Sequence, residues 1–97
     1  MSELPVARIV HFNFRNAKDC DLFYLRAEKE TAELAKETLQ RTIIKVDEKS
    51  LILFALYKNE EDLHTAGDRI NPWIAQFKKD DAMETIPITG DVVLRKA

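Results

Sequence analysis

Cysteine, glycine and proline are scarce in this sequence, and each scarcity excludes a class of protein. Cys20 is the single cysteine and cannot form a disulfide within the chain, so a reducing cytoplasm is the expected compartment. Two Gly and three Pro exclude collagen-like and linker-like chains. Gly67 and Gly90 are isolated and form no phosphate-binding loop. Gly67 is expected instead to let a helix pack closely against its neighbours.

Long apolar runs and an excess of basic charge are also missing. The longest apolar run, Leu51 to Tyr57, is too short to span a bilayer, and we expect no signal peptide. We therefore expect no membrane partner. The 15 basic and 17 acidic residues leave a net charge of −2 and form no basic stripe, so nucleic acid is not an expected partner either.

The residues that are present predict a mixed α+β domain. The chain has 97 residues, of which 45% are hydrophobic, and this supports one folded domain over residues 1–97. β-Branched and aromatic residues predict strands over Val6–Phe14, Arg41–Val46 and Leu51–Lys58. Further strand-like segments, Met83–Thr89 and Val92–Leu94, are expected to be divided at Gly90-Asp91. Pro87 indicates that this last strand is an edge strand or carries a bulge.

Two helices are predicted, and each follows an asparagine that can cap it. Asn16 precedes a segment of roughly twenty residues whose apolar side chains recur at helical spacing. Asn59 precedes the second helix. Pro72 is expected to interrupt this helix, with Asn71 capping a new short helical segment.

The two halves of the chain repeat one pattern. Phe14, Asn16 and Asp19 recur 43 positions later as Tyr57, Asn59 and Asp62, since 57 follows 14 and 62 follows 19 by the same step. Each half is therefore expected to form a strand, a capped helix and a strand. Two such units predict a ferredoxin-like βαββαβ sandwich, in which a four-stranded antiparallel sheet carries both helices on one face.

Alternation along the central strands produces two faces that are both largely apolar. One face comprises Val10, Phe12, Phe14, Leu53, Ala55 and Tyr57, and the other comprises Ile9, His11, Asn13, Ile52, Phe54 and Leu56. Two helices on one side of the sheet can cover only one of these faces. We therefore predict a homodimer in which the uncovered faces of two sheets pack together.

This architecture and two short motifs resemble the dimeric α/β-barrel superfamily, especially its antibiotic biosynthesis monooxygenase-like members. Tyr57-Lys58-Asn59-Glu60-Glu61-Asp62-Leu63 resembles the family's strand end and helix start, and Asn71-Pro72-Trp73 resembles its small-Pro-large step. The resemblance implies that two copies form an α/β barrel. It also implies cofactor-independent oxygenation of a small aromatic or quinol-like compound in a dry pocket between helices and sheet, without metal or flavin.

Seven side chains are candidates for such a site. His11 and Asn13 share a strand face and are catalytic candidates, as a base and a hydrogen-bonding partner, or else form a satisfied polar pair in the dimer interface. His64, on the second helix, is a third catalytic candidate, with an exposed or interfacial position as the alternative. The substrate-binding candidates are Tyr24, Tyr57, Arg69 and Trp73, of which Trp73 is alternatively a packing residue.

Other chemistries have little support in the sequence. The two histidines have no HxH or HxxxH spacing, so no metal site is expected, and Cys20 lies on an apolar stripe as an expected inert thiol. Neither Ser2 nor Ser50 lies beside a histidine, so no serine triad is expected. Two functions stay open: a cofactor-independent monooxygenase, and a non-catalytic small-molecule-binding or assembly module on the same fold. An isomerase or dehalogenase would need an acid–base pair that the sequence does not display.

Overall fold

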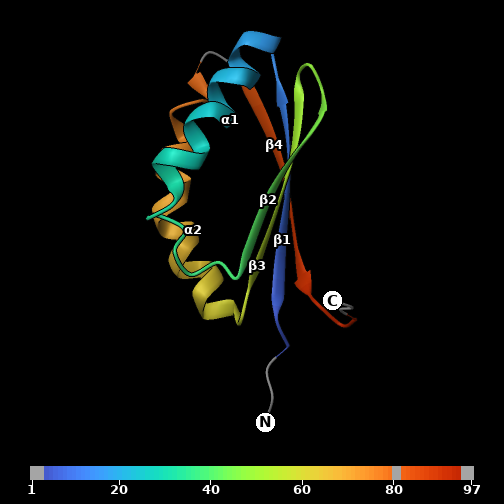
Figure 1. Cartoon of the computed structure of the whole chain (residues 1–97), viewed down its shortest axis with the longest axis vertical. Coiled ribbons are helices and arrows are strands. Elements are labelled where there is room, and N and C mark those ends of the chain that lie inside the picture. Colours follow the sequence, from blue (N-terminus) through green and yellow to red (C-terminus); the bar gives the residue numbers. More distant parts are fainter. Residues whose placement is uncertain (1–3, 80–81, 95–97) are drawn as a thin grey trace.

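The computed structural model describes residues 4–79 and 82–94, which form four strands and two helices in βαββαβ order (Figure 1). The elements are β1 (Val6–Phe14), α1 (Ala17–Thr31), β2 (Gln40–Asp47), β3 (Ser50–Tyr57), α2 (Glu60–Ala75) and β4 (Met83–Asp91). This order confirms the ferredoxin-like fold that the repeated strand–helix–strand pattern predicts.

The four strands form one antiparallel sheet in the order β2-β3-β1-β4. β1 lies inside the sheet, where Val10 pairs with Leu53 on β3 and with Pro87 on β4. β4 is an edge strand, as Pro87 predicts. An edge strand tolerates proline because the missing N–H is not needed for pairing inside the sheet. β2 forms the other edge, and its register shifts between Lys45 and Asp47, next to the turn into β3.

Both helices begin at the predicted asparagine caps. The Asn16 side-chain oxygen accepts a hydrogen bond from the Asp19 backbone N–H at 2.8 Å, and Asn59 accepts from Asp62 at the same distance. Each cap thereby satisfies a backbone donor that has no partner within the helix. Asp19 and Asp62 also place negative charge in the first turn, where the helix dipole favours it.

The first helix is shorter than the sequence predicts. α1 ends at Thr31 after 15 residues, and residues 32–37 form turns. The guanidinium of Arg41 on β2 donates to the Thr31 backbone oxygen at 3.3 Å and to its hydroxyl oxygen at 2.6 Å. Because a cation and hydrogen-bond donors are favourable at a helix C-terminus, this contact from the sheet stabilises the early end of α1.

The second helix is not interrupted where the sequence predicts a break. α2 runs from Glu60 to Ala75 with Pro72 inside it, and Asn71 is a helical residue rather than the cap of a new segment. Proline removes one backbone hydrogen bond, but only three helical residues follow it, so little of the helix depends on that bond. No helix in residues 4–79 and 82–94 is both long enough and apolar enough to cross a membrane.

The last strand is continuous where a division was expected. β4 extends through Gly90 and Asp91, whereas residues 92–94 belong to no strand. Gly90 pairs with Ala7 and Asp91 pairs with Val6, so β4 follows β1 to the beginning of that strand. Gly90 adopts no left-handed backbone conformation and therefore forces no turn at this point.

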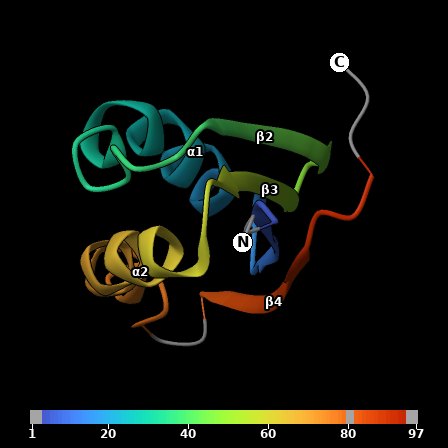
Figure 2. The same ribbon diagram turned by 90° about the horizontal axis from the view of Figure 1, so that it is seen from below.

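The core lies between the two helices and one face of the sheet (Figure 2). Phe23 on α1 is at its centre, with its ring centroid 4.8 Å from that of Phe12, 5.3 Å from Phe14 and 5.2 Å from Trp73. Cys20 is fully buried beside this group, and burial raises the pKa of its thiol. This confirms the expected burial of Cys20 among apolar side chains.

The opposite face of the sheet carries no helix (Figure 1). By alternation it presents Ile9, His11, Ile52 and Phe54 in the centre and Ile44, Ile86 and Ile88 toward the edges. Ile86 and Ile88 are 52% and 63% exposed, whereas helix-facing Val10 and Phe12 are buried. The predicted division into two faces is confirmed, except that Leu56, expected on the uncovered face, is only 2% exposed.

Candidate functional site

A small cavity lies between the sheet and the two helices. Its volume is about 50 Å³, and residues of β1, β2, β3, α1 and α2 line it. The register places two kinds of lining residue at different levels of the sheet. Phe12 pairs with Leu51, whereas Arg8 pairs with Ala55 four residues earlier on β1. The cavity therefore has an aromatic part near Phe12 and a polar part near Arg8.

Two arginines define the polar part. Ala55 on the central strand β3 pairs with Arg8 on β1 and with Arg41 on β2, so both arginine side chains lie at the level of Ala55 on the helix-facing side. Side chains directly opposite each other on adjacent strands have Cβ atoms about 5 Å apart. The small side chain of Ala55 thus lies between the strand positions of the two arginines, and all three residues line the cavity.

The two arginines differ in their hydrogen bonds. Arg41 is anchored to the end of α1 through Thr31. Arg8 has no hydrogen bond or ion pair to any residue in 4–79 or 82–94. Its guanidinium lies under α2, where a Cβ atom built on Gly67 would be 3.7 Å from Arg8 Nη1. The approach is ordinary van der Waals contact, so close packing does not require the glycine that was expected to permit it.

Tyr57 adds a phenol group to the polar part. It lies two residues beyond Ala55 on the same face of β3 and is only 5% exposed. Burial raises the pKa of Tyr57, while the positive charges of Arg8 and Arg41 act in the opposite direction. The hydroxyl is therefore protonated at neutral pH and can donate a hydrogen bond to a bound oxygen atom.

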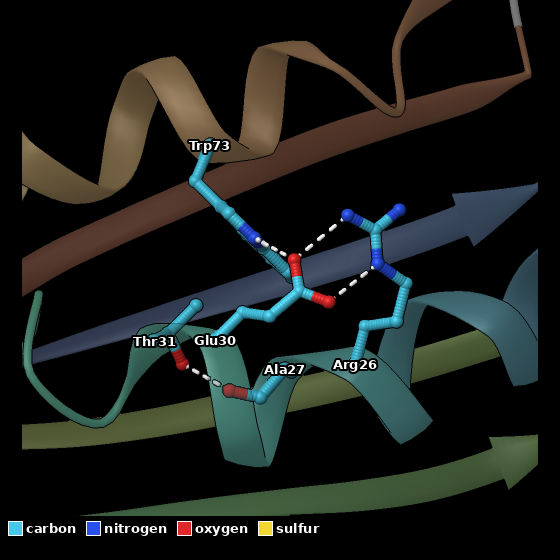
Figure 3. A network of polar contacts seen from close by, with 5 residues as sticks. All are labelled: Arg26, Ala27, Glu30, Thr31 and Trp73. Atoms are coloured by element: carbon cyan, nitrogen blue, oxygen red, sulfur yellow. Dashed lines mark hydrogen bonds and ion pairs between the residues drawn. The ribbon is translucent and has the colours of Figure 1, made fainter.

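Trp73 forms part of the aromatic wall and is held by a polar network (Figure 3). Its indole N–H donates to a carboxylate oxygen of Glu30 at 3.2 Å. Arg26 donates to the two carboxylate oxygens of Glu30 at 2.6 and 2.7 Å. The hydrogen bonds from Arg26 and Trp73 lower the pKa of Glu30 to about 2. The network fixes the orientation of the indole ring against the cavity.

Of the four predicted substrate-binding residues, the structure brings Tyr57 and Trp73 together at the cavity. Tyr24 lies instead in a separate surface groove between α1 and β2, with the Lys45 ammonium 5.5 Å from its ring centroid. Arg69 is outside the cavity, where it forms an ion pair with Glu37 at 2.8 Å.

The three predicted catalytic residues do not line the cavity. His11 and Asn13 alternate with Val10 and Phe12 on β1 and lie on the uncovered face, as the alternation predicts. The Asn13 side-chain oxygen accepts a hydrogen bond from the Ser50 hydroxyl at 3.0 Å. His64 lies on the exposed side of α2, with its ring nitrogen 3.3 Å from Glu60. A catalytic role for these residues stays a prediction.

Arg8 and Arg41 are not among the sequence candidates, although Arg8 carries a signal. Arg8 shares its strand face with Val6, Val10 and Phe12, so a charge occupies a position where alternation predicts an apolar residue. Only the pairing of β3 with both neighbouring strands brings Arg41 to the same place. In residues 4–79 and 82–94, no three His, Cys, Asp or Glu side chains are grouped to hold a metal ion.

No protein-family model and no curated protein sequence matches the chain. Solved structures do match it. A dimeric ferredoxin-like protein from an uncultured marine organism is 17% identical, with a TM-score of 0.78 over 97% of this chain and 100% of its own. A variant of SnoaB, a cofactor-independent oxygenase from Streptomyces nogalater, is 11% identical, with a TM-score of 0.74 over 96% of this chain and 97% of its own.

A protein from Nitrosomonas europaea, proposed to be an antibiotic biosynthesis monooxygenase, is 13% identical to this chain. Its TM-score is 0.76 over 100% of this chain and 98% of its own. Sequence identities this low establish the fold rather than the activity. The chain therefore has the ferredoxin-like fold that these dimeric and monooxygenase-related structures share.

Proposed function

We propose that the chain is a homodimeric α/β-barrel protein whose subunits associate through the uncovered faces of their sheets. The support is the row of isoleucines on this face, of which Ile86 and Ile88 are more than half exposed in the single chain. Fully burying one such side chain contributes roughly 1.5–3 kcal/mol, so leaving the whole face in water is unfavourable. The marine protein with the same fold is itself described as dimeric.

The dimer is tested by solution mass from light scattering coupled to size exclusion. We expect the wild-type chain to keep the mass of a dimer at low micromolar concentration. Ile88→Lys should produce a folded monomer, because a lysine cannot be buried against a second sheet without a partner. Leu25→Lys is the matched control, since Leu25 on α1 is 62% exposed and far from this face. A wild-type monomer would contradict the proposal.

We further propose that each subunit oxygenates a small aromatic, quinol-like compound in the cavity, using dioxygen without metal or flavin. The single observation that supports this best is the cavity itself: aromatic side chains line one part, and Arg8, Arg41 and Tyr57 line the other. Such a site excludes water around an aromatic ring and can stabilise its deprotonated oxygen, which makes the ring electron-rich. The similar structure of the cofactor-independent oxygenase SnoaB supports the same proposal.

The proposed reaction balances without a further reductant. A phenol and one O₂ give a quinone and one water, with one atom of the O₂ in each product and the phenol oxygen kept in the quinone. The ring C–H and the phenol O–H supply the two hydrogens of water, and the ring supplies the electrons. The part of this chain is to bind the ring, to hold the phenolate near the guanidinium groups and to keep bulk water away from the reacting carbon.

The size of the cavity requires movement when a ring binds. Its volume is about 50 Å³, whereas a protein cavity that holds benzene is roughly 150 Å³. Arg41 and Ile43 on the edge strand β2 line both the cavity and the surface groove beside Tyr24. Ile43 is 37% exposed, so its side chain can move outward. We propose this edge, between α1 and β2, as the entrance.

The oxygenase proposal is tested by oxygen consumption with a panel of small phenols and hydroquinones, and by detection of the quinone. We expect uptake above the rate without protein, and a loss of at least tenfold in Ala55→Leu, because its larger side chain fills the space between the arginines. Ala75→Leu introduces the same side chain at an exposed position of α2 and should leave the rate unchanged. Binding of a phenol without oxygen uptake would refute catalysis and favour the non-catalytic binding module.

The same assay examines His11 and Asn13. In the proposed dimer both residues lie in the interface rather than the cavity. His11→Ala should therefore weaken the dimer, as measured by solution mass, while the turnover of the dimer that remains stays close to that of the wild type. A large loss of turnover in an intact His11→Ala dimer would support the catalytic role predicted for it.

The free, buried thiol of Cys20 is compatible with the proposed cytoplasmic compartment.

A further inference from the structure

We infer that the cavity takes an anionic ligand, whose oxyanion binds between Arg8 and Arg41 above the methyl group of Ala55. The inference rests on the proposed function only in treating the cavity as a binding site. It adds that the ligand is already anionic when it binds, and it extends the ligand class from phenolates to aromatic carboxylates; the proposed reaction forms a phenolate but does not require the free ligand to carry the charge.

The charges around the cavity carry the inference. Arg8 and Arg41 are the charged side chains among its lining residues, and no Asp or Glu of residues 4–79 or 82–94 is among them. The cavity therefore has two positive charges in a protein whose net charge is −2. Half-buried cations without a counter-ion are unfavourable, and an anion between them would remove that cost.

The other arginines in the described residues all have a carboxylate partner. Arg15, Arg26 and Arg69 each have a carboxylate within 3.2 Å, from Asp19, Glu30 and Glu37. Within the described ranges, the two arginines that line the cavity are the two without an ion-paired carboxylate. Glu37, which acts electrostatically on nearby Tyr57, is already held by Arg69.

The shape of the site indicates the kind of anion. A guanidinium group offers a planar fork of N–H donors that matches the two oxygens of a carboxylate and also binds a phenolate oxygen. Tyr57, two residues beyond Ala55 on the same face of β3, can donate a third hydrogen bond. The apolar part of the ligand would then extend along β1 toward Phe23 and Trp73. The class is therefore an aromatic oxyanion, either a carboxylate or a phenolate.

The test compares ligands that differ in charge and share their shape. Binding of benzoate and of neutral benzamide is measured at one salt concentration by amide chemical-shift titration of the full-length protein. 4-Nitrophenol is titrated on both sides of its own ionisation to examine the phenolate. We expect benzoate to bind at least tenfold more tightly than benzamide, with shifts at Ala55 and Gly67. If affinity depends on charge for 4-nitrophenol and not for the benzoate and benzamide pair, the site binds a phenolate rather than a carboxylate.

Variants locate the anion. Arg8→Met removes the charge and keeps most of the aliphatic stem, so benzoate affinity should fall about 10- to 100-fold while benzamide affinity is unchanged. Arg8→Lys should recover part of the loss, because the charge returns without the fork. Arg15→Met removes an exposed arginine outside the cavity and should leave both affinities unchanged. Arg41→Met is the weaker probe, since it also releases the end of α1.

Three results would overturn the inference: no difference in affinity between the charged and the neutral form in either pair of probes, no binding of any charged probe, or an equal loss in Arg8→Met and Arg15→Met. The last result would mean that benzoate affinity depends on the overall charge of the protein and not on the cavity. These outcomes are independent of turnover. Charge-dependent binding without oxygen consumption would refute the proposed reaction and leave the anion site standing.

Discussion

Replacing Arg8 by methionine should stabilise the unliganded protein, although most substitutions at half-buried positions destabilise. Arg8 and Arg41 lie on strands that flank β3 at the level of Ala55. Adjacent strands are about 4.8 Å apart, so the two side chains start roughly 10 Å from each other. In the unliganded protein the two positive charges repel each other, and Arg8 has no partner among residues 4–79 and 82–94 that offsets this repulsion.

The magnitude follows from Coulomb's law. Two unit charges at roughly 10 Å repel by about 1.7 kcal/mol at an effective dielectric constant of 20, and by about half that where solvent reaches the pair. Methionine keeps most of the apolar contacts of the arginine stem. We therefore expect Arg8→Met to raise the free energy of unfolding by about 1 kcal/mol. For a domain of this size that is an increase in Tm of roughly 4–8 °C.

The assay is thermal and urea unfolding at one fixed protein concentration, because association of subunits makes stability depend on concentration. Arg15→Met is the control: it removes an ion-paired arginine from the surface and should be neutral or slightly destabilising. Addition of benzoate should raise the Tm of the wild type and not that of Arg8→Met. If Arg8→Met lost more than about 1 kcal/mol without ligand, the guanidinium would be a structural group, and the reasoning would be refuted.

Three further predictions concern α2, the Trp73 network and Cys20. Gly67→Ala should raise the free energy of unfolding by about 1 kcal/mol in urea titrations, because alanine is the better helix former and the new methyl group has room; a decrease would show that the helix needs the glycine. Glu30 has a pKa lowered from 4.5 to about 2, so its contribution to stability is present above pH 4.5 and lost as the pH falls toward 2. The Tm advantage of wild type over Glu30→Gln should therefore shrink across that interval, and a constant difference would contradict the network. Alkylation of Cys20 by iodoacetamide should be slow in the folded protein and fast in denaturant, since the thiol is buried and its pKa is raised; fast labelling of folded protein would show that the first turns of α1 open readily.

Much of the fold was predictable because it depends on local patterns. Alternation along Val6–Phe14 defines β1 to the residue, and Asn16 and Asn59 cap the helices within hydrogen-bonding reach of their own chain neighbours. The errors occur where a distant element intervenes. Arg41 reaches from β2 to the end of α1, and β1 provides pairing partners for β4 beyond Gly90. Neither contact leaves a signal in the neighbouring sequence.

The candidate site shows the same limit. Tyr57 and Trp73 were predicted as aromatic side chains that carry a polar group, but the same reasoning also selected Tyr24, which lies outside the cavity. His11 and Asn13 were predicted from the strand face that lies away from the cavity. Arg8 was detectable as a charge on an apolar face. The sequence alone could not show whether its guanidinium had a partner.

The sequence by itself determined the order of the elements, the caps and the separation of the strand faces, since these follow from side chains within a few positions of one another. The tertiary structure alone decided the site. Arg8 and Arg41 are distant in the chain and meet only because β3 pairs with both of their strands, with Ala55 between them. Strand pairing depends on the packing of the whole sheet against two helices, so no local pattern encodes which residues become neighbours across it.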